Sequence, residues 1–134
     1  AADLDGDGRL EIVVAEGESD RGRLAWMAPP DWKPRTLHEG LFHPHSLEIA
    51  DFDGDGLPDI FVGEMDLGRH ADQRLLVYRN MGAGWFQECE ISSGVSTHEA
   101  KVADIDGDGR PDIVGKPYSA KGRIDLWLNE TVSG

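Results

Sequence analysis

Hydrophobic and polar positions alternate in short stretches of this chain, which is the pattern of half-buried β-strands. Stretches at His45–Ala50 and His98–Ala103 each precede a polar turn, and an apolar, β-branched run follows each polar turn. No window shows helical periodicity with caps, so the chain is predicted to be all-β. The predicted strands after the polar turns are Ile12–Ala15, Ile60–Gly63 and Ile113–Gly115; third strands follow at Arg23–Ala28, Arg74–Asn80 and Arg123–Asn129, and fourth strands at Lys33–His38 and Trp85–Ile91.

This order of strands repeats about every fifty residues, and four antiparallel strands in a unit of that length are typical of a β-propeller blade. The middle unit (43–95) is complete, whereas the first unit (1–42) lacks its first strand and the last (96–134) stops after its third. The sequence therefore predicts one domain that is a segment of a β-propeller, with just under three four-stranded blades. Because a closed propeller has typically four to eight blades, we expect either a larger parent chain or self-association.

The polar turn between the first two strands of each unit carries one motif, Ala-Asp-x-Asp-Gly-Asp-Gly-x-x-(Asp/Glu). Its copies are Ala2–Glu11, Ala50–Asp59 and Ala103–Asp112. Asp-Gly is turn chemistry in any protein, so three solvated acidic turns are the alternative interpretation. Three copies with one internal spacing favour a dedicated site instead.

The spacing of the motif suits a hard cation, because its alternate aspartates converge from one side of a tight turn. In the second copy Gly56 allows the positive φ that bends the chain back, and Asp59 closes the cage. Ca²⁺ takes six to eight oxygen ligands at flexible angles, whereas transition metals prefer His or Cys, so up to three Ca²⁺ ions are predicted. The candidate ligands are Asp3, Asp5, Asp7, Glu11 and the carbonyl of Arg9; Asp51, Asp53, Asp55, Asp59 and the carbonyl of Leu57; and Asp104, Asp106, Asp108, Asp112 and the carbonyl of Arg110.

An EF-hand shares the first half of this motif but needs a bidentate Glu at position twelve and flanking helices. Position twelve is Val14, Val62 and Gly115 in the three copies, and the flanks read as strands. These features argue against a helical calcium sensor.

Charge adds to this picture, since the formal net charge is −13 and the loops hold a large share of the 26 acidic residues. Such acidity argues against a nucleic-acid partner, which needs a basic surface. No stretch approaches the roughly twenty apolar residues of a membrane span. Cys89 is the single cysteine and has no internal partner for a disulfide. Loops of modest charge fill best where Ca²⁺ is millimolar, so we expect an extracellular or periplasmic location.

The Asp-x-Asp-Gly-Asp-Gly-x-x-Asp loops followed by Ile, together with the turn Asn80-Met81-Gly82-Ala83-Gly84-Trp85-Phe86, resemble the FG-GAP/VCBS-type repeats of bacterial secreted proteins, which are related to the integrin α-subunit propeller. The resemblance covers essentially the whole chain. It implies an ion in the hairpin between the first two strands of each blade, on one rim of the propeller. The chain has no Phe-Gly or Gly-Ala-Pro pair, which places it nearer the bacterial repeats than the integrins. Glu11 also departs from the pattern, so the first cage is expected to be looser.

A second group of candidates lies outside the loops. His45 and His98 occupy equivalent points at the start of the innermost strand, where a pair of imidazoles suits metal or sugar binding, although packing between blades is the commoner role. Glu64 and Lys116 follow equivalent glycines in the second strand. A carboxylate there could serve acid–base chemistry, but we expect these residues to be solvated or to link blades. Trp26, Tyr78 and Trp127 recur inside strands, which favours core packing over sugar stacking. Trp32 and Trp85 lie in or beside turns and are better candidates for an exposed aromatic platform.

These observations predict a calcium-stabilised β-propeller scaffold that binds an extracellular protein or a glycan. The alternative is a part, catalytic or not, of a carbohydrate-active enzyme such as a propeller polysaccharide lyase. The sequence contains no recognisable nucleophile, phosphate-binding or zinc-hydrolase motif.

Overall fold

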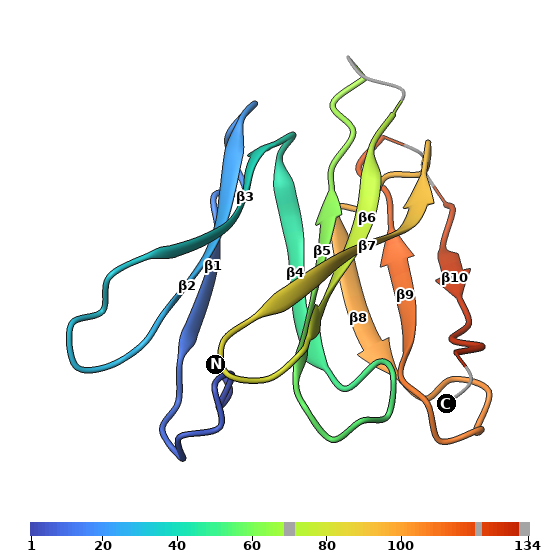
Figure 1. The fold of residues 1–134 in the computed structure, drawn as a ribbon. Helices are drawn as coiled ribbons and strands as arrows, with labels where there is room; N and C mark the ends of the chain where they lie inside the picture. Colours follow the sequence, from blue (N-terminus) through green and yellow to red (C-terminus); the bar gives the residue numbers. More distant parts are fainter. Residues whose placement is uncertain (69–71, 120–121, 132–134) are drawn as a thin grey trace.

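The computed structural model describes residues 1–68, 72–119 and 122–131, and these contain ten β-strands and no helix. The strands form three antiparallel sheets that stand side by side like the blades of a propeller (Figure 1). An all-β chain is thereby confirmed, while the exact boundaries of the three units stay a prediction. The strands are β1 Ile12–Ala15, β2 Gly22–Met27 and β3 Arg35–Leu41 in the first sheet; β4 Pro44–Ala50, β5 Asp59–Glu64, β6 Arg74–Asn80 and β7 Phe86–Ser93 in the second; and β8 Glu99–Ala103, β9 Asp112–Lys116 and β10 Asp125–Trp127 in the third.

The order of strands within each sheet follows the chain, as in a meander. The second sheet has the order β4-β5-β6-β7, the first has β1-β2-β3, and the third has β8-β9-β10. In the first sheet a single backbone bridge between Ala2 and Glu11 takes the place of a first strand. Both outer sheets therefore have three strands among the described residues, which is the arrangement that the repeat pattern predicts.

Most of the predicted strand boundaries differ from the structure by one to three residues, and hydrogen bonds explain two of these differences. The fourth strand of the first unit begins at Arg35 rather than Lys33, because residues 28–32 form a turn in which the Trp32 N–H donates to the Ala28 carbonyl over 2.9 Å. The third strand of the last unit spans only Asp125–Trp127. It ends before Asn129, whose N–H donates to the Asp112 carboxylate instead of a strand partner.

The central strands β5 and β6 of the middle sheet are buried on both faces, and their side chains alternate between two cores. In β5, Ile60 and Val62 pack with Leu24 and Leu41 of the first sheet. Phe61 points the other way and packs with the third sheet, in a cluster that includes Ala100 and Ile113. A continuous apolar run is what a strand covered on both faces requires, and it explains why all six residues of β5 are buried.

The aromatics that recur in the predicted third strands do not all occupy equivalent positions. Tyr78 pairs with Ile60 and Trp127 with Ile113, but Trp26 pairs with Val13, so the true equivalent of Tyr78 in the first sheet is Met27. A shift of one residue turns a side chain to the opposite face of a sheet. Trp26 consequently projects toward the second sheet and meets Phe86 edge to face, with ring centroids 6.2 Å apart.

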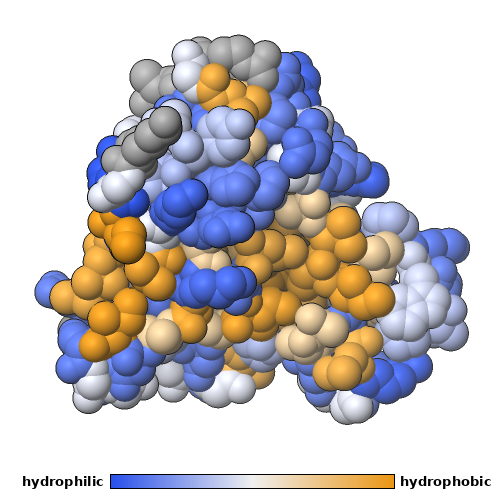
Figure 2. Space-filling view, turned by 180° about the vertical axis from the view of Figure 1, so that it is seen from behind, coloured by the Kyte–Doolittle hydropathy of each residue, from blue (hydrophilic) through white to orange (hydrophobic). Residues whose placement is uncertain are grey.

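The outer sheets leave apolar side chains uncovered. Ile12, Val14, Leu126 and Leu128 are exposed, and Figure 2 shows hydrophobic residues gathered on the side of the molecule turned away in Figure 1. Ile113 of the third sheet, by contrast, is buried against the second sheet. The outward faces of the two outer sheets therefore lack a covering sheet among the described residues.

Candidate metal centre

The three motif loops lie at the same end of their sheets, where the first strand turns into the second (Figure 1). β4 leads into the second loop and β5 leaves it, and β8 and β9 flank the third in the same way. The first loop is closed by two backbone hydrogen bonds between Ala2 and Glu11, of 3.2 and 2.8 Å. One rim of the segment therefore carries all three acidic turns.

The first aspartate of each loop shapes the turn from within. Asp51 accepts hydrogen bonds from the backbone N–H groups of Gly54 (2.8 Å), Asp55 (3.1 Å) and Gly56 (2.8 Å). Asp3 and Asp104 accept the corresponding bonds in their loops. Gly54 and Gly56 have φ of 74° and 90°, so the expected need for glycine at the bend is confirmed. These are local Asx turns, which explains how one short motif folds the same way three times.

The closing carboxylate of the second and third loops does more than the sequence indicated. Asp59 is fully buried, and its two oxygens accept the N–H groups of Phe52 and Asn80, each over 2.8 Å. Asp112 likewise accepts from Ile105 and Asn129. In both repeats this side chain ties the start of the loop to the end of the third strand.

Two asparagines that the sequence analysis passed over join each loop to the next sheet. The Asn80 amide nitrogen donates to the Leu4 carbonyl of the first loop over 2.8 Å, and the Asn129 amide nitrogen donates to the Phe52 carbonyl of the second loop over 2.7 Å. Leu4 and Phe52 hold the same position in their motifs. The signal in the sequence was the recurrence of Asn at the end of the predicted third strand.

The first loop is the exception in this pattern. Glu11 is 0% exposed and its Oε2 accepts the Leu4 N–H over 2.5 Å, but its Oε1 has no hydrogen-bond partner among the residues that the structure describes. A buried carboxylate oxygen without a donor is unfavourable unless something else compensates its charge. Glu11 therefore fits the presence of a cation.

The loops bring most of the predicted carboxylates together. All four carboxylates of the first loop have oxygens within 4.8 Å of one another, as do Asp51, Asp53 and Asp59 of the second and Asp104, Asp106 and Asp108 of the third. Asp55 and Asp112 lie outside these groups. The residues predicted to offer a carbonyl oxygen to the ion are Arg9, Leu57 and Arg110. Each lies two residues after a loop aspartate that accepts its backbone N–H.

Arginine side chains also reach the loops, which reduces their charge. Arg9 contacts Asp7 through Nε at 2.9 Å and Arg79 contacts Asp53 through Nε at 2.7 Å, while Arg110 pairs with Asp108. The hydrogen bond from Arg9 holds the pKa of Asp7 below its ordinary value. For Asp53, burial raises the pKa, and the hydrogen bonds from Arg79 and Asp55 more than offset that effect.

The two closing aspartates differ in their electrostatics although they make equivalent hydrogen bonds. Burial raises the pKa of Asp59 to about 6, because the middle sheet is covered on both faces. The pKa of Asp112 is lowered, chiefly by the hydrogen bonds from the backbone of Asn129 and Ile105. The surroundings of this motif position thus favour the protonated carboxyl group at Asp59 and the ionised carboxylate at Asp112.

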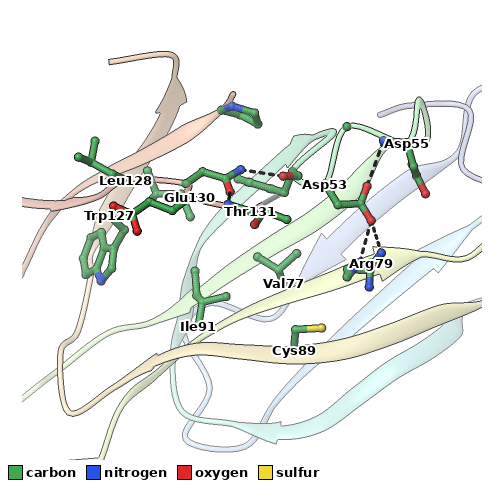
Figure 3. A pocket seen from close by; sticks show the side chains of 15 residues that line it. Asp53, Asp55, Val77, Arg79, Cys89, Ile91, Trp127, Leu128, Glu130 and Thr131 are labelled. Carbon is green, nitrogen blue, oxygen red and sulfur yellow. Dashed lines mark hydrogen bonds and ion pairs between the residues drawn. The ribbon is translucent and has the colours of Figure 1, made fainter. Parts of the chain in front are cut away.

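A cavity of about 680 Å³ opens beside the second loop, between the second and third sheets (Figure 3). Val77, Ile91 and Trp127 form its apolar wall, and Arg79 and Asp53 form its polar end. Val77 holds the position in the second sheet that Trp26 holds in the first. Each pairs with the residue that follows the first isoleucine of the neighbouring strand, which is β5 for Val77 and β1 for Trp26. The cavity therefore lies between the second and third sheets at the position that the rings of Trp26 and Phe86 fill between the first and second sheets.

The remaining candidates have structural partners. His45 and His98 stack with ring centroids 4.4 Å apart, and His45 Nδ1 lies 3.1 Å from the His98 carbonyl oxygen, so the two link neighbouring sheets. Glu64 is buried, where it accepts the Phe42 N–H over 2.8 Å and pairs with Arg74. Trp32 and Trp85 are exposed, as expected.

Comparison with known proteins agrees with the repeat architecture. A family model described as FG-GAP-like repeat matches residues 3–62 and 51–115 of the chain. Human integrin alpha-7 is 30% identical over 95 residues, an alignment that covers 62% of this chain and 8% of the integrin. The chain thus spans a small part of the length of this relative.

Asn80→Ala is expected to lower the free energy of unfolding by about 2 to 4 kcal/mol, because it leaves the carbonyls of Leu4 and Pro58 and the N–H of Gly82 without partners. Urea denaturation measures this loss. Gln87→Ala, at an exposed position of the same sheet, is the control and should change stability by less than about 0.5 kcal/mol. Equal effects of the two substitutions would contradict the role assigned to Asn80.

The raised pKa of Asp59 predicts a pH dependence of the calcium-free protein. Its carboxyl group has an ordinary pKa of 3.8 and a pKa of about 6 in the fold, so the stability linked to its proton is present below pH 3.8 and is lost as the pH rises through 6. In chelator, the wild type should lose on the order of 2 to 3 kcal/mol more than Asp59→Asn between pH 4 and pH 7. Thermal unfolding of both proteins across this range checks the difference, and parallel curves would refute it.

Proposed function

Because the chain belongs to the FG-GAP-like repeat family and forms a segment of a β-propeller scaffold, we propose that it is a calcium-stabilised scaffold that acts outside the cytoplasm and binds a protein or a glycan. The observation that carries the proposal is the repeated loop in which three or four carboxylates converge on one point.

Calcium is the ion that the donor set favours. The three loops offer only carboxylate and carbonyl oxygens, which suit Ca²⁺, and the described residues provide no His or Cys in any of the three clusters. Asp3, Asp5, Asp7 and Glu11 would hold the first ion, and Asp51, Asp53 and Asp59 the second, with Asp104, Asp106 and Asp108 for the third. When bound, the ion supplies positive charge that compensates carboxylates packed against one another.

A location outside the cytoplasm is supported by the likeness to an integrin subunit and by the modest charge of the loops, which fill best at millimolar calcium. No helix among the described residues is long and apolar enough to cross a membrane. The enzyme alternative has no specific observation in its favour, since Glu64 pairs with Arg74 and the two histidines stack on each other.

The partner is proposed to bind the rim opposite the ion loops. The innermost strands β4 and β8 begin there, and the stacked rings of His45 and His98 continue into Tyr118, whose ring centroid lies 5.3 Å from that of His98. Tyr118 is 58% exposed. Exposed aromatic rings are suited to stacking on sugar rings or on the side chains of a protein partner.

We also propose that the outer sheets are covered in the functional protein, either by another copy of the chain or by further blades of a longer one. Unpaired strand edges recruit other strands, and the apolar residues Ile12, Val14, Leu126 and Leu128 lie exposed on the two outer sheets or beside them. A repeat buries its apolar face only against a neighbour.

Calcium is expected to raise the melting temperature, because an ion that binds only the folded state stabilises it by about 2.7 kcal/mol per site at roughly 100 times its dissociation constant. Calorimetry in millimolar Ca²⁺ and in excess EDTA measures the shift. Asp53→Ala should reduce the shift, whereas Asp66→Ala, outside every loop, should leave it unchanged. Identical melting curves with and without calcium would end the calcium proposal.

The rim assignment can be tested with two aromatic residues of similar exposure at opposite rims. Trp85 is 61% exposed and lies in the β6–β7 turn on the side of the ion loops, whereas Tyr118 lies in the β9–β10 connection. We expect Tyr118→Ala to weaken binding at least about tenfold in a titration against a panel of soluble polysaccharides, and Trp85→Ala to have little effect. Loss of binding only in Trp85→Ala would place the partner on the ion-loop rim instead.

A further inference from the structure

We propose that the first loop is the tightest of the three ion sites and fills before the others, and that Glu11 is the residue that sets it apart. This inference rests on the calcium binding proposed above. It reverses the expectation from the sequence, in which Glu11 made the first cage looser. The reason lies in what the closing carboxylate of each loop already binds.

In the second and third loops the closing carboxylate is committed to the backbone. Both oxygens of Asp59 accept N–H groups from within the protein, and so do both oxygens of Asp112. A carboxylate that already accepts two hydrogen bonds has part of its charge compensated without an ion. These two aspartates therefore gain less from a cation than an uncompensated carboxylate does.

The first loop lacks the backbone donor that binds the second oxygen of the closing carboxylate in the other two loops. Strand pairing aligns Ile12 with Met27, Ile60 with Tyr78 and Ile113 with Trp127. Two residues further along, the second and third sheets have Asn80 and Asn129, whose N–H groups bind Asp59 and Asp112. The first sheet has Pro29 at this position, and proline has no N–H to donate.

Glu11 consequently has one carboxylate oxygen that no protein donor occupies. Its Oε1 is buried and lacks a hydrogen-bond partner in the part of the chain that the structure describes. The side chain is one methylene longer than aspartate, and its carboxylate joins Asp3, Asp5 and Asp7 within 4.8 Å. The first loop thus assembles four carboxylates where the second and third each assemble three.

Arginines that pair with loop carboxylates compete with a bound ion, and this competition is weaker in the first loop than in the second. In the second loop Arg79 contacts Asp53 through both Nε and a terminal nitrogen, and the Asp53 side chain is only 9% exposed. In the first loop a different arginine, Arg9 within the loop itself, pairs with Asp7 at an exposed position. Water screens an exposed pair, so an ion displaces Arg9 at a smaller cost than Arg79.

Tryptophan-sensitised terbium luminescence can locate the first ion to bind. A Cβ built on Gly84 would lie 3.0 Å from the Trp26 ring and 3.9 Å from Asp5 Cβ, so Trp26 and the neighbouring Trp85 are close to the first loop. Trp127 lines the cavity beside the second loop. With less than one Tb³⁺ per chain, the double variant Trp26→Phe, Trp85→Phe should lose most of the signal and Trp127→Phe should lose little. The opposite result would overturn the inference.

Calorimetric titration of Ca²⁺ into Glu11→Gln supplies the second test, with circular dichroism to verify that the variant is folded. The tightest site should weaken about tenfold or more, as expected when a metal-site carboxylate is altered. Asp59→Asn should leave the tightest site unchanged and weaken a later one. If the wild type binds no Ca²⁺ or Tb³⁺, the proposed function itself is wrong. If it binds ions but Glu11→Gln retains the tightest site, only the order of filling is wrong.

Discussion

A buried carboxylate at the base of each hairpin is the constraint around which this protein is organised. Burying a charge is costly unless donors or a cation surround it, and the second repeat supplies two donors from different parts of the chain. Phe52 N–H comes from the loop of Asp59, and Asn80 N–H comes from the end of β6. The same asparagine then reaches Leu4 in the preceding repeat. One hydrogen-bonded unit therefore fixes the loop, the third strand and the neighbouring sheet at once.

This constraint explains why three nearly identical motifs have different properties. Asp59 lies in a sheet covered on both faces, so burial dominates and its pKa rises. Asp112 lies in an outer sheet, where the backbone N–H groups dominate and its pKa falls. At Glu11 the second donor is replaced by Pro29, and a buried oxygen is left without a protein partner among the described residues. The repeats share a sequence pattern, but their surroundings decide how each carboxylate behaves.

The two rims of the segment serve different purposes in this interpretation. The ion-loop rim is built from local turns and buried carboxylates, and its proposed contribution is stability. The opposite rim carries the stacked rings of His45 and His98 and the exposed Tyr118. A rigid base of this kind allows the connections at the other end to vary without loss of the fold, which is a common arrangement for binding proteins.

The sequence by itself determined the features that depend on neighbouring residues. Strand periodicity, the Asx turns around Asp51 and the need for Gly56 all involve interactions within a few residues, so the motif specifies them directly. Only the tertiary structure decided the rest. Trp26 is one residue out of register with Tyr78, because strand pairing and not sequence spacing sets which face a side chain occupies. The bond from Asn80 to Leu4 spans 76 residues and forms only when one sheet stacks on the next. The free oxygen of Glu11 likewise depends on Pro29, which the pairing of β1 with β2 brings to the place of an asparagine.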